Sequence, residues 1–317
     1  MNLQYSIIIP VYNRPDEVQE LLESLTKMKG NFPFEVVIVE DGSPNTSEKI
    51  IDAYKDKLTL KYYLTENQGA GKSRNYGMKQ ATGNYFIIFD SDCLIPEGYL
   101  MAVDCQLKKH YTDAFGGPDA AHESFTDVQK AINYAMTSLM TTGGIRGKKK
   151  AVGKFQPRSF NLGISKKAFE KSEGFSDLKI GEDIDLTFRL WKEGFETQLI
   201  DAAYVYHKRR ADFAQFYRQT NAFGKARPFL NKRFPGTAKI TYWLPSLFFI
   251  GFIISLLGTA FEIYLGVLFY AFYFMVLAIH AMIKERSLRV GVLSVIATCV
   301  QFYGYGTGFL TTYFQKK

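Results

Sequence analysis

The chain has 317 residues, enough for one large domain or two smaller ones, and carries a formal net charge of +8 at neutral pH. Its three cysteines, Cys93, Cys105 and Cys299, are too few and too scattered for a disulfide framework or a zinc site. No basic segment precedes the apolar run that starts at Tyr5, so we predict no signal peptide and a cytosolic soluble part.

The first ninety residues contain short apolar stretches that alternate with helical patterns. Strands that are apolar along their whole length are typical of a parallel sheet buried on both faces. The pattern therefore predicts an α/β fold, with a mostly parallel sheet and helices on both of its faces. Asn13 is expected to cap the first helix. The expected strands end near Pro10, Asp41, Asn67 and Asp92, and the expected helices cover residues 14–28, 45–56 and 69–83.

Polar residues gather where these strands end. They are Tyr12 and Asn13 after the first strand, Glu40 and Asp41 after the second, and Asp90 and Asp92 after the fourth. The carboxyl ends of parallel strands meet at one rim, which is where ligands bind in such sheets. Carboxylates at this rim suit Mg²⁺ or Mn²⁺, ions that usually also hold substrate phosphates. The segment "NQGAGKSRN" lacks the glycine spacing of a phosphate-binding P-loop, so that interpretation fails.

Five motifs together resemble a known family. In chain order they are "SIIIPVYNR", "VVIVEDGS", "NQGAGKSRNYG", "FDSDCLIP" and "GEDIDLTFRL". This set resembles a family 2 glycosyltransferase of the Rossmann-like GT-A fold, and the resemblance spans about residues 5–225. The resemblance implies that a nucleotide-sugar, with uridine favoured as its base, lies across the carboxyl rim of the sheet. It also implies transfer with inversion to a saccharide or lipid-linked acceptor in cell-surface glycan synthesis.

The resemblance also implies roles for individual residues. Tyr12 and Asp41 would contact the nucleotide base with help from Arg74, and Asp90 would approach the ribose. Asp92 would hold the divalent metal, Mg²⁺ or Mn²⁺, with His207 as a second metal ligand. Glu40 stands where the family often has aspartate, which puts its own contact in doubt. The full set that the resemblance places at the nucleotide-sugar is Pro10, Tyr12, Asn13, Glu40, Asp41, Arg74 and Asp90.

A second acidic pair, Glu182 and Asp183, begins the helix expected in residues 175–195. From the residues alone, a well-capped helix explains this pair, because a helix N-terminus stabilises anions. The family pattern instead makes Asp183 the general base and Glu182 its catalytic neighbour, whose charge would raise the pKa of Asp183 together with burial. Asn161, on the strand that precedes this helix, is a candidate acceptor contact. The glycine-rich basic segment 141–153 is expected to close over phosphates or only to be solvated.

The last third of the chain has three runs without charged side chains, at residues 240–261, 263–283 and 290–315. A membrane-spanning helix needs about 20 apolar residues, so the first two runs fit well and the third fits less well. A buried hairpin of a soluble domain is the alternative. Lysine and arginine residues before the first run and after the second predict that the N-terminal domain is inside the cell. We expect an integral protein of the cell (inner) membrane with a cytosolic catalytic domain.

The expected organisation is thus a catalytic domain at residues 1–235 and a membrane domain with two to three transmembrane helices at residues 236–317. Residues 208–235 combine basic side chains with Phe213, Phe216, Tyr217 and Phe223 at helical spacing, which suits an anionic leaflet better than nucleic acid. Two other functions stay open. The chain could transfer sugar directly to a polyprenyl phosphate, or it could be a non-catalytic membrane scaffold that retains the nucleotide-binding fold.

Overall fold

The computed structural model describes residues 2–142 and 154–315 of the chain. Its internal contacts divide the chain into two compact units, Met1–His122 with Gly147–His207, and Glu123–Arg146 with Lys208–Lys317. The first unit holds every candidate site residue. Most of the basic segment 141–153 lies outside the described residues. The segment 208–235 groups with the C-terminal helices, whereas we had expected it to end the catalytic domain.

A seven-stranded sheet forms the centre of the first unit, in the order β3-β2-β1-β4-β8-β6-β9. The strands β1, β2, β3 and β4 are parallel to one another, as are β6 and β9, while β8 is antiparallel to β4 and β6. The expectation of a mostly parallel sheet is therefore confirmed. The bounds are β1 (Tyr5–Val11), β2 (Phe34–Asp41), β3 (Thr59–Thr65), β4 (Tyr85–Phe89), β6 (Ala114–Gly116), β8 (Asn161–Ser165) and β9 (Thr197–Leu199).

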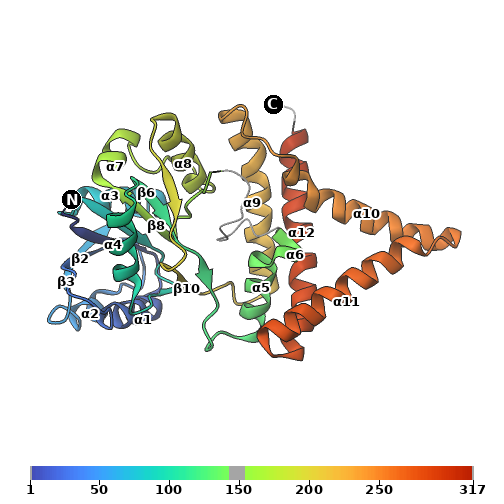
Figure 1. The fold of residues 1–317 in the computed structure, drawn as a ribbon, viewed down its shortest axis with the longest axis horizontal. Coiled ribbons are helices and arrows are strands. Elements are labelled where there is room, and N and C mark those ends of the chain that lie inside the picture. The colour runs from blue at the N-terminus through green and yellow to red at the C-terminus, as the bar shows by residue number, and fades with distance from the viewer. Residues whose placement is uncertain (1, 143–153, 316–317) are drawn as a thin grey trace. The chain divides into compact units, whose positions relative to one another are not determined.

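Helices cover both faces of this sheet, as Figure 1 shows. Alternate side chains of β1 enter two separate cores, Ile7 and Ile9 on one face and Ile8 on the other. The first core includes side chains of α1 (Pro15–Thr26), α2 (Glu48–Asp52) and α4 (Tyr99–Lys109). The second includes side chains of α3 (Ala70–Gln80), α7 (Lys166–Ser172) and α8 (Glu182–Lys192). Burial on two faces explains why the strands are apolar throughout.

The first strand continues through Pro10 to Val11, one residue beyond the expected end. Pro10 pairs in register with Val39 of β2, while the pairing of β1 with β4 has already ended at Ile8. Proline is tolerated there because only one side of the strand is still paired. The expected cap is wrong: α1 has Arg14 as its N-cap, and Asn13 lies in the left-handed region with φ 55°.

The chain runs outward from β1 through β2 to β3 and then returns to place β4 on the other side of β1. The carboxyl ends of β1 and β4 are thus the point where the strand order reverses, the position where open α/β sheets bind ligands. A small second sheet of β5 (Cys93–Leu94), β10 (Val205–His207) and β7 (Asp119–Ala120) adjoins this point, because β5 follows β4 directly. It pairs His207 with Cys93.

The second unit is helical: α5 (Asp127–Thr137), α6 (Leu139–Thr142), α9 (Phe213–Arg233), α10 (Leu244–Gly258), α11 (Leu265–Glu285) and α12 (Leu288–Phe314), with short 3-10 turns at Ile240–Trp243 and Thr259–Phe261. Within the described residues, three segments are long and apolar enough to cross a membrane, Ile240–Phe261, Leu265–Glu285 and Leu288–Phe314. The third run, which fitted less well from its sequence, therefore forms a helix of spanning length.

Glycines on the third run and on α9 allow these two helices to pack closely. A Cβ on Gly224 of α9 would collide with the carbonyl oxygen of Tyr305, and a Cβ on Gly308 of α12 would collide with that of Asn221. Small residues allow two helices to approach this closely. Figure 1 shows α9 and α12 side by side. This contact is the physical reason why α9 belongs to the second unit.

The aromatic side of α9 is consequently covered by protein. Phe216 is fully buried, and Phe213 and Phe223 pack around it against side chains of α5 and α12. Tyr217 stacks on Tyr303 of α12 with ring centroids 5.5 Å apart. The expectation that these rings face an anionic leaflet is corrected, because their apolar surface is used within the second unit.

Candidate active site

Acids from two distant parts of the chain meet at one arginine. Arg74, on α3, donates to Asp90 Oδ1 at 2.7 Å and to Glu182 Oε1 at 3.1 Å. Asp90 directly follows β4, and Glu182 is the first residue of α8. The guanidinium is buried, with 4% of the side chain exposed, and lies over the ring of Phe175. Arg74 therefore links the rim of the sheet to the first turn of α8.

The start of α8 follows from its local sequence. Gly181 is the N-cap in the left-handed region, with φ 78°, a conformation that glycine adopts without steric cost. Asp183 lies in the first turn and accepts the N–H of Ile184 at its Oδ1, at 2.8 Å. Its other oxygen, Oδ2, is 3.6 Å from Arg158 Nη1. The predicted position of both acids in the first turn is confirmed.

Asp92 lies between two cationic or potentially cationic groups. Arg14 Nη1 is 3.0 Å from Asp92 Oδ2, and His207 Nε2 is 3.1 Å from Asp92 Oδ1. The sulfur of Cys93 completes a group of three possible ligand atoms that lie within 4.8 Å of one another. Asp92 and His207, expected together from the sequence, are thus brought together by the fold.

Four acids of the site have an arginine partner. Arg14 pairs with Asp92, Arg74 with Asp90 and Glu182, and Arg158 with Asp183. Sequence reasoning identified Arg74 but missed the other two. Arg14 had a usable signal, because it ends the motif "SIIIPVYNR" a few residues after an expected strand. Arg158 had none, because a single arginine in an irregular segment has no distinguishing pattern.

The acids after β2 have different partners. The Asp41 carboxylate accepts the backbone N–H groups of Gln68 and Gly69, each at 2.9 Å, and so holds the loop that leads into α3. Glu40 is fully buried and accepts the N–H of Ser47 at 2.9 Å and the hydroxyl of Ser43. The expected nucleotide contact of Glu40 is corrected: its carboxylate stabilises the turn after β2.

The remaining residues expected at the nucleotide differ in exposure. Tyr12 is 52% exposed just beyond the end of β1, so its ring is accessible to a ligand. Asn13 donates its backbone N–H to the hydroxyl of Ser43 at 2.7 Å. Pro10 is buried within β1, and its expected contact with the nucleotide stays a prediction.

Asn161 does not fit the acceptor contact expected for it. Its side chain is fully buried, its Oδ1 accepts the hydroxyl of Tyr99 at 2.5 Å, and its Nδ2 donates to the carbonyl of Ala203 at 2.8 Å. Both ends of the amide are therefore used to join β8 to α4 and to the segment before β10. This role is structural.

Burial raises the pKa of Glu182 to about 7, and the charge of Asp183 adds to the rise while Arg74 opposes it. A carboxyl whose folded-state pKa is raised stabilises the fold fully below its unfolded pKa, near 4.5, and that contribution is lost as the pH rises through about 7. The sequence predicts that the charge of Glu182 and burial raise the pKa of Asp183. In the structure, the carboxyl group whose pKa is raised is that of Glu182.

We expect Glu182→Gln to remove this pH dependence. The unfolding free energy of the wild type minus that of the variant should fall by about 3 kcal/mol between pH 4.5 and pH 8. Thermal unfolding of the full chain in detergent across this range measures it. Glu170→Gln, at an exposed position on α7, is the control and should show no such trend. A difference that stays constant with pH would contradict the prediction.

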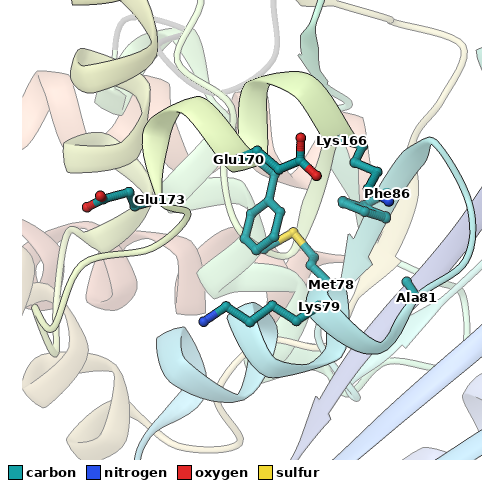
Figure 2. Close-up of a pocket in the computed structure, with 8 residues that line it drawn as sticks. Met78, Lys79, Ala81, Phe86, Lys166, Glu170 and Glu173 are labelled. Carbon is teal, nitrogen blue, oxygen red and sulfur yellow. The ribbon is translucent and has the colours of Figure 1, made fainter.

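A pocket of about 540 Å³ lies elsewhere on the first unit (Figure 2). Met78 and Lys79 come from the end of α3, Phe86 from the start of β4, and Lys166 from the start of α7. These positions are at the amino ends of the parallel strands, opposite the acidic rim. The full lining is Met78, Lys79, Ala81, Phe86, Lys166, Phe169, Glu170 and Glu173. The pocket is therefore separate from the candidate active site.

The fold is that of GT-A glycosyltransferases. The mannosyltransferase PcManGT from Pyrobaculum calidifontis, solved with GDP-Man and Mn²⁺, superposes with a TM-score of 0.57 at 17% identity, over 96% of this chain and 88% of that one. Residues 1–349 of Staphylococcus aureus TarS, solved with UDP-GlcNAc, superpose with a TM-score of 0.51 at 21% identity, over 98% of this chain and 91% of that one.

The chain belongs to glycosyl transferase family 2, whose model matches residues 6–172, more than half of its length. The model of glycosyl transferase family group 2 matches residues 160–286. The poly(ribitol-phosphate) β-N-acetylglucosaminyltransferase TarS of Staphylococcus aureus is 37% identical over 35% of this chain, and the hyaluronan synthase of Pasteurella multocida is 25% identical over 64% of it. The matched parts are 20% and 24% of these relatives, so the chain spans only a fraction of their length.

Proposed function

We propose that this chain is an inverting, metal-dependent glycosyltransferase that transfers a sugar from a nucleotide-diphospho-sugar to a saccharide or lipid-linked acceptor. The observation that carries the proposal is the convergence of Asp90 and Glu182 on Arg74, with Asp92 two residues from Asp90 and Asp183 next to Glu182. A binding scaffold needs no general base, whereas Asp183 lies beside this cluster as a candidate for that role. Membership of family 2 supports the same conclusion.

The donor set at Asp92 fits a divalent cation. Asp92 and His207 each offer a ligand atom, with His207 Nε2 3.1 Å from Asp92 Oδ1. A carboxylate and an imidazole suit Mn²⁺ better than Mg²⁺, which prefers oxygen ligands alone. When bound, such an ion would neutralise charge on the diphosphate leaving group. We therefore propose Mn²⁺ as the preferred ion.

The other residues of the site would bind the nucleotide or act as the general base. Tyr12 is accessible at the end of β1 and would contact the base of the nucleotide. Asp90, held by Arg74, would face the ribose. Asp183 would take the proton from the acceptor hydroxyl as the oxygen forms its bond to the anomeric carbon and the bond to the diphosphate breaks. Attack from the face opposite the leaving group gives inversion.

The donor and the acceptor are proposed from the relatives and from the apolar helices. TarS was solved with UDP-GlcNAc, and relatives named hyaluronan synthase and chondroitin synthase make polysaccharides, which together favour a UDP-sugar and a glycan product. Three helices of spanning length support a membrane-anchored enzyme. We propose that it lies in the cell membrane with its first unit in the cytosol, where nucleotide-sugars and lipid-linked acceptors would both reach it.

The test measures nucleotide release by the full chain in detergent. A panel of nucleotide-sugars is incubated with membrane extracts as the acceptor pool, with Mn²⁺, with Mg²⁺ or with EDTA. We expect UDP release from at least one UDP-sugar, loss of this release with EDTA, and greater recovery with Mn²⁺ than with Mg²⁺. Donor binding without metal-dependent release in any acceptor pool would favour the non-catalytic scaffold and reject the enzyme.

A further inference from the structure

The three arginines of the acidic rim differ in their freedom to move. Arg74 is almost fully buried, with 4% of its side chain exposed, and contacts two acids at once. Arg158 is 21% exposed. Arg14 is 36% exposed and is attached through a single nitrogen, Nη1, which is 3.0 Å from Asp92 Oδ2 and 2.8 Å from Glu17 Oε2. Arg14 is therefore the most exposed of the three arginines, and Glu17 can still hold it if it leaves Asp92.

Arg14 contacts the carboxylate that a divalent cation at this rim would use. It is the N-cap residue of α1 and comes three residues after the end of β1, so it lies at the point where the strand order reverses. Asp92 Oδ1 is next to His207, and Asp92 Oδ2 is next to Arg14. A divalent cation that takes both Asp92 and His207 as ligands must either share the Asp92 carboxylate with the Arg14 guanidinium or displace the guanidinium. Displacement is favoured because two cations at one carboxylate repel each other.

We propose that Arg14 and the divalent cation compete for Asp92, and that Arg14, once displaced, binds the diphosphate of the donor. Glu17 keeps the guanidinium near the crevice during this exchange. Without nucleotide, Arg14 weakens metal binding; with metal and nucleotide present, it strengthens nucleotide binding. The cation and the diphosphate therefore bind as a pair. The proposal rests on the proposed function only in placing a cation and a diphosphate at this rim.

The test compares Arg14→Ala with the wild type, using the full chain in detergent. Mn²⁺ binding without nucleotide is measured by electron paramagnetic resonance, and UDP binding at saturating Mn²⁺ by calorimetry. We expect Arg14→Ala to bind Mn²⁺ about fivefold more tightly, as expected for removal of a partly exposed ion pair. It should bind UDP about tenfold more weakly, as expected for loss of a charged contact. Arg14→Lys should fall between the two proteins in both measurements.

Lys27→Ala is the matched control, because it removes one positive charge from the end of the same helix, where Lys27 is exposed and pairs with Glu23. It should change neither affinity. Opposite changes in the two affinities distinguish the exchange from a structural role, which would weaken both. Unchanged or weaker Mn²⁺ binding in Arg14→Ala would overturn the proposal, as would the absence of Mn²⁺ binding in every variant. Neither measurement requires turnover, so the proposed function stands or fails separately in the nucleotide-release test.

Discussion

Replacing Asp183 with asparagine is expected to lower kcat for sugar transfer by at least about 100-fold, because general-base catalysis contributes about 10²- to 10⁴-fold. Asparagine preserves the shape of the side chain and its place in the first turn of α8, so donor binding should persist. UDP release in the presence of acceptor measures the rate, and UDP calorimetry measures the donor site.

Asp177→Asn is the control for this substitution, because Asp177 lies on the same segment but is 82% exposed and pairs only loosely with Lys72, at 3.4 Å. It should retain normal kcat. Glu182→Gln decides between the two acids of the pair. If Asp183→Asn retained most of its activity while Glu182→Gln lost it, the general base would be Glu182, whose pKa of about 7 suits a proton acceptor near neutral pH.

Replacing Arg74 with methionine is expected to lower the free energy of unfolding by about 3 kcal/mol at pH 8, because it leaves Asp90 and buried Glu182 without their shared cation. The loss of unfolding free energy should be smaller below pH 6. Glu182 is mostly protonated there because its pKa is about 7, and a neutral carboxyl group needs no counter-charge. Thermal unfolding of the full chain in detergent at both pH values measures the effect.

A second substitution tests the stated cause. Arg74→Met combined with Glu182→Gln removes both the cation and one of its acids, so it should recover part of the lost stability at pH 8. Lys79→Met, at an exposed position on the same helix, should be nearly neutral. An equal loss at both pH values, without recovery in the double variant, would show that Arg74 acts through packing on Phe175 instead of through charge.

The sequence by itself determined the sheet, its rim and the helices that cover it. Short apolar runs such as residues 85–89, rich in aromatic and β-branched residues, indicate buried strands. Buried parallel strands align their carboxyl ends, so the common location of Asp41, Asp90 and Asp92 followed from local pattern. Gly181 and the acids after it likewise predicted the start of α8. The family motifs added the pairing of Asp92 with His207, which local pattern does not contain.

Only the tertiary structure decided which groups meet. Asn161 looked like an acceptor contact, but the antiparallel insertion of β8 beside β4 buries it against Tyr99. The spacing of the aromatic residues on α9 predicted that they bind a membrane surface. Glycines on α9 and α12 instead bring these helices into contact, so the rings pack within the second unit. Local periodicity reports which side of an element is apolar; it does not report what covers that side. The partners of Arg14 and Arg158 depend on strand order and register, which join residues far apart in the chain and leave no local pattern.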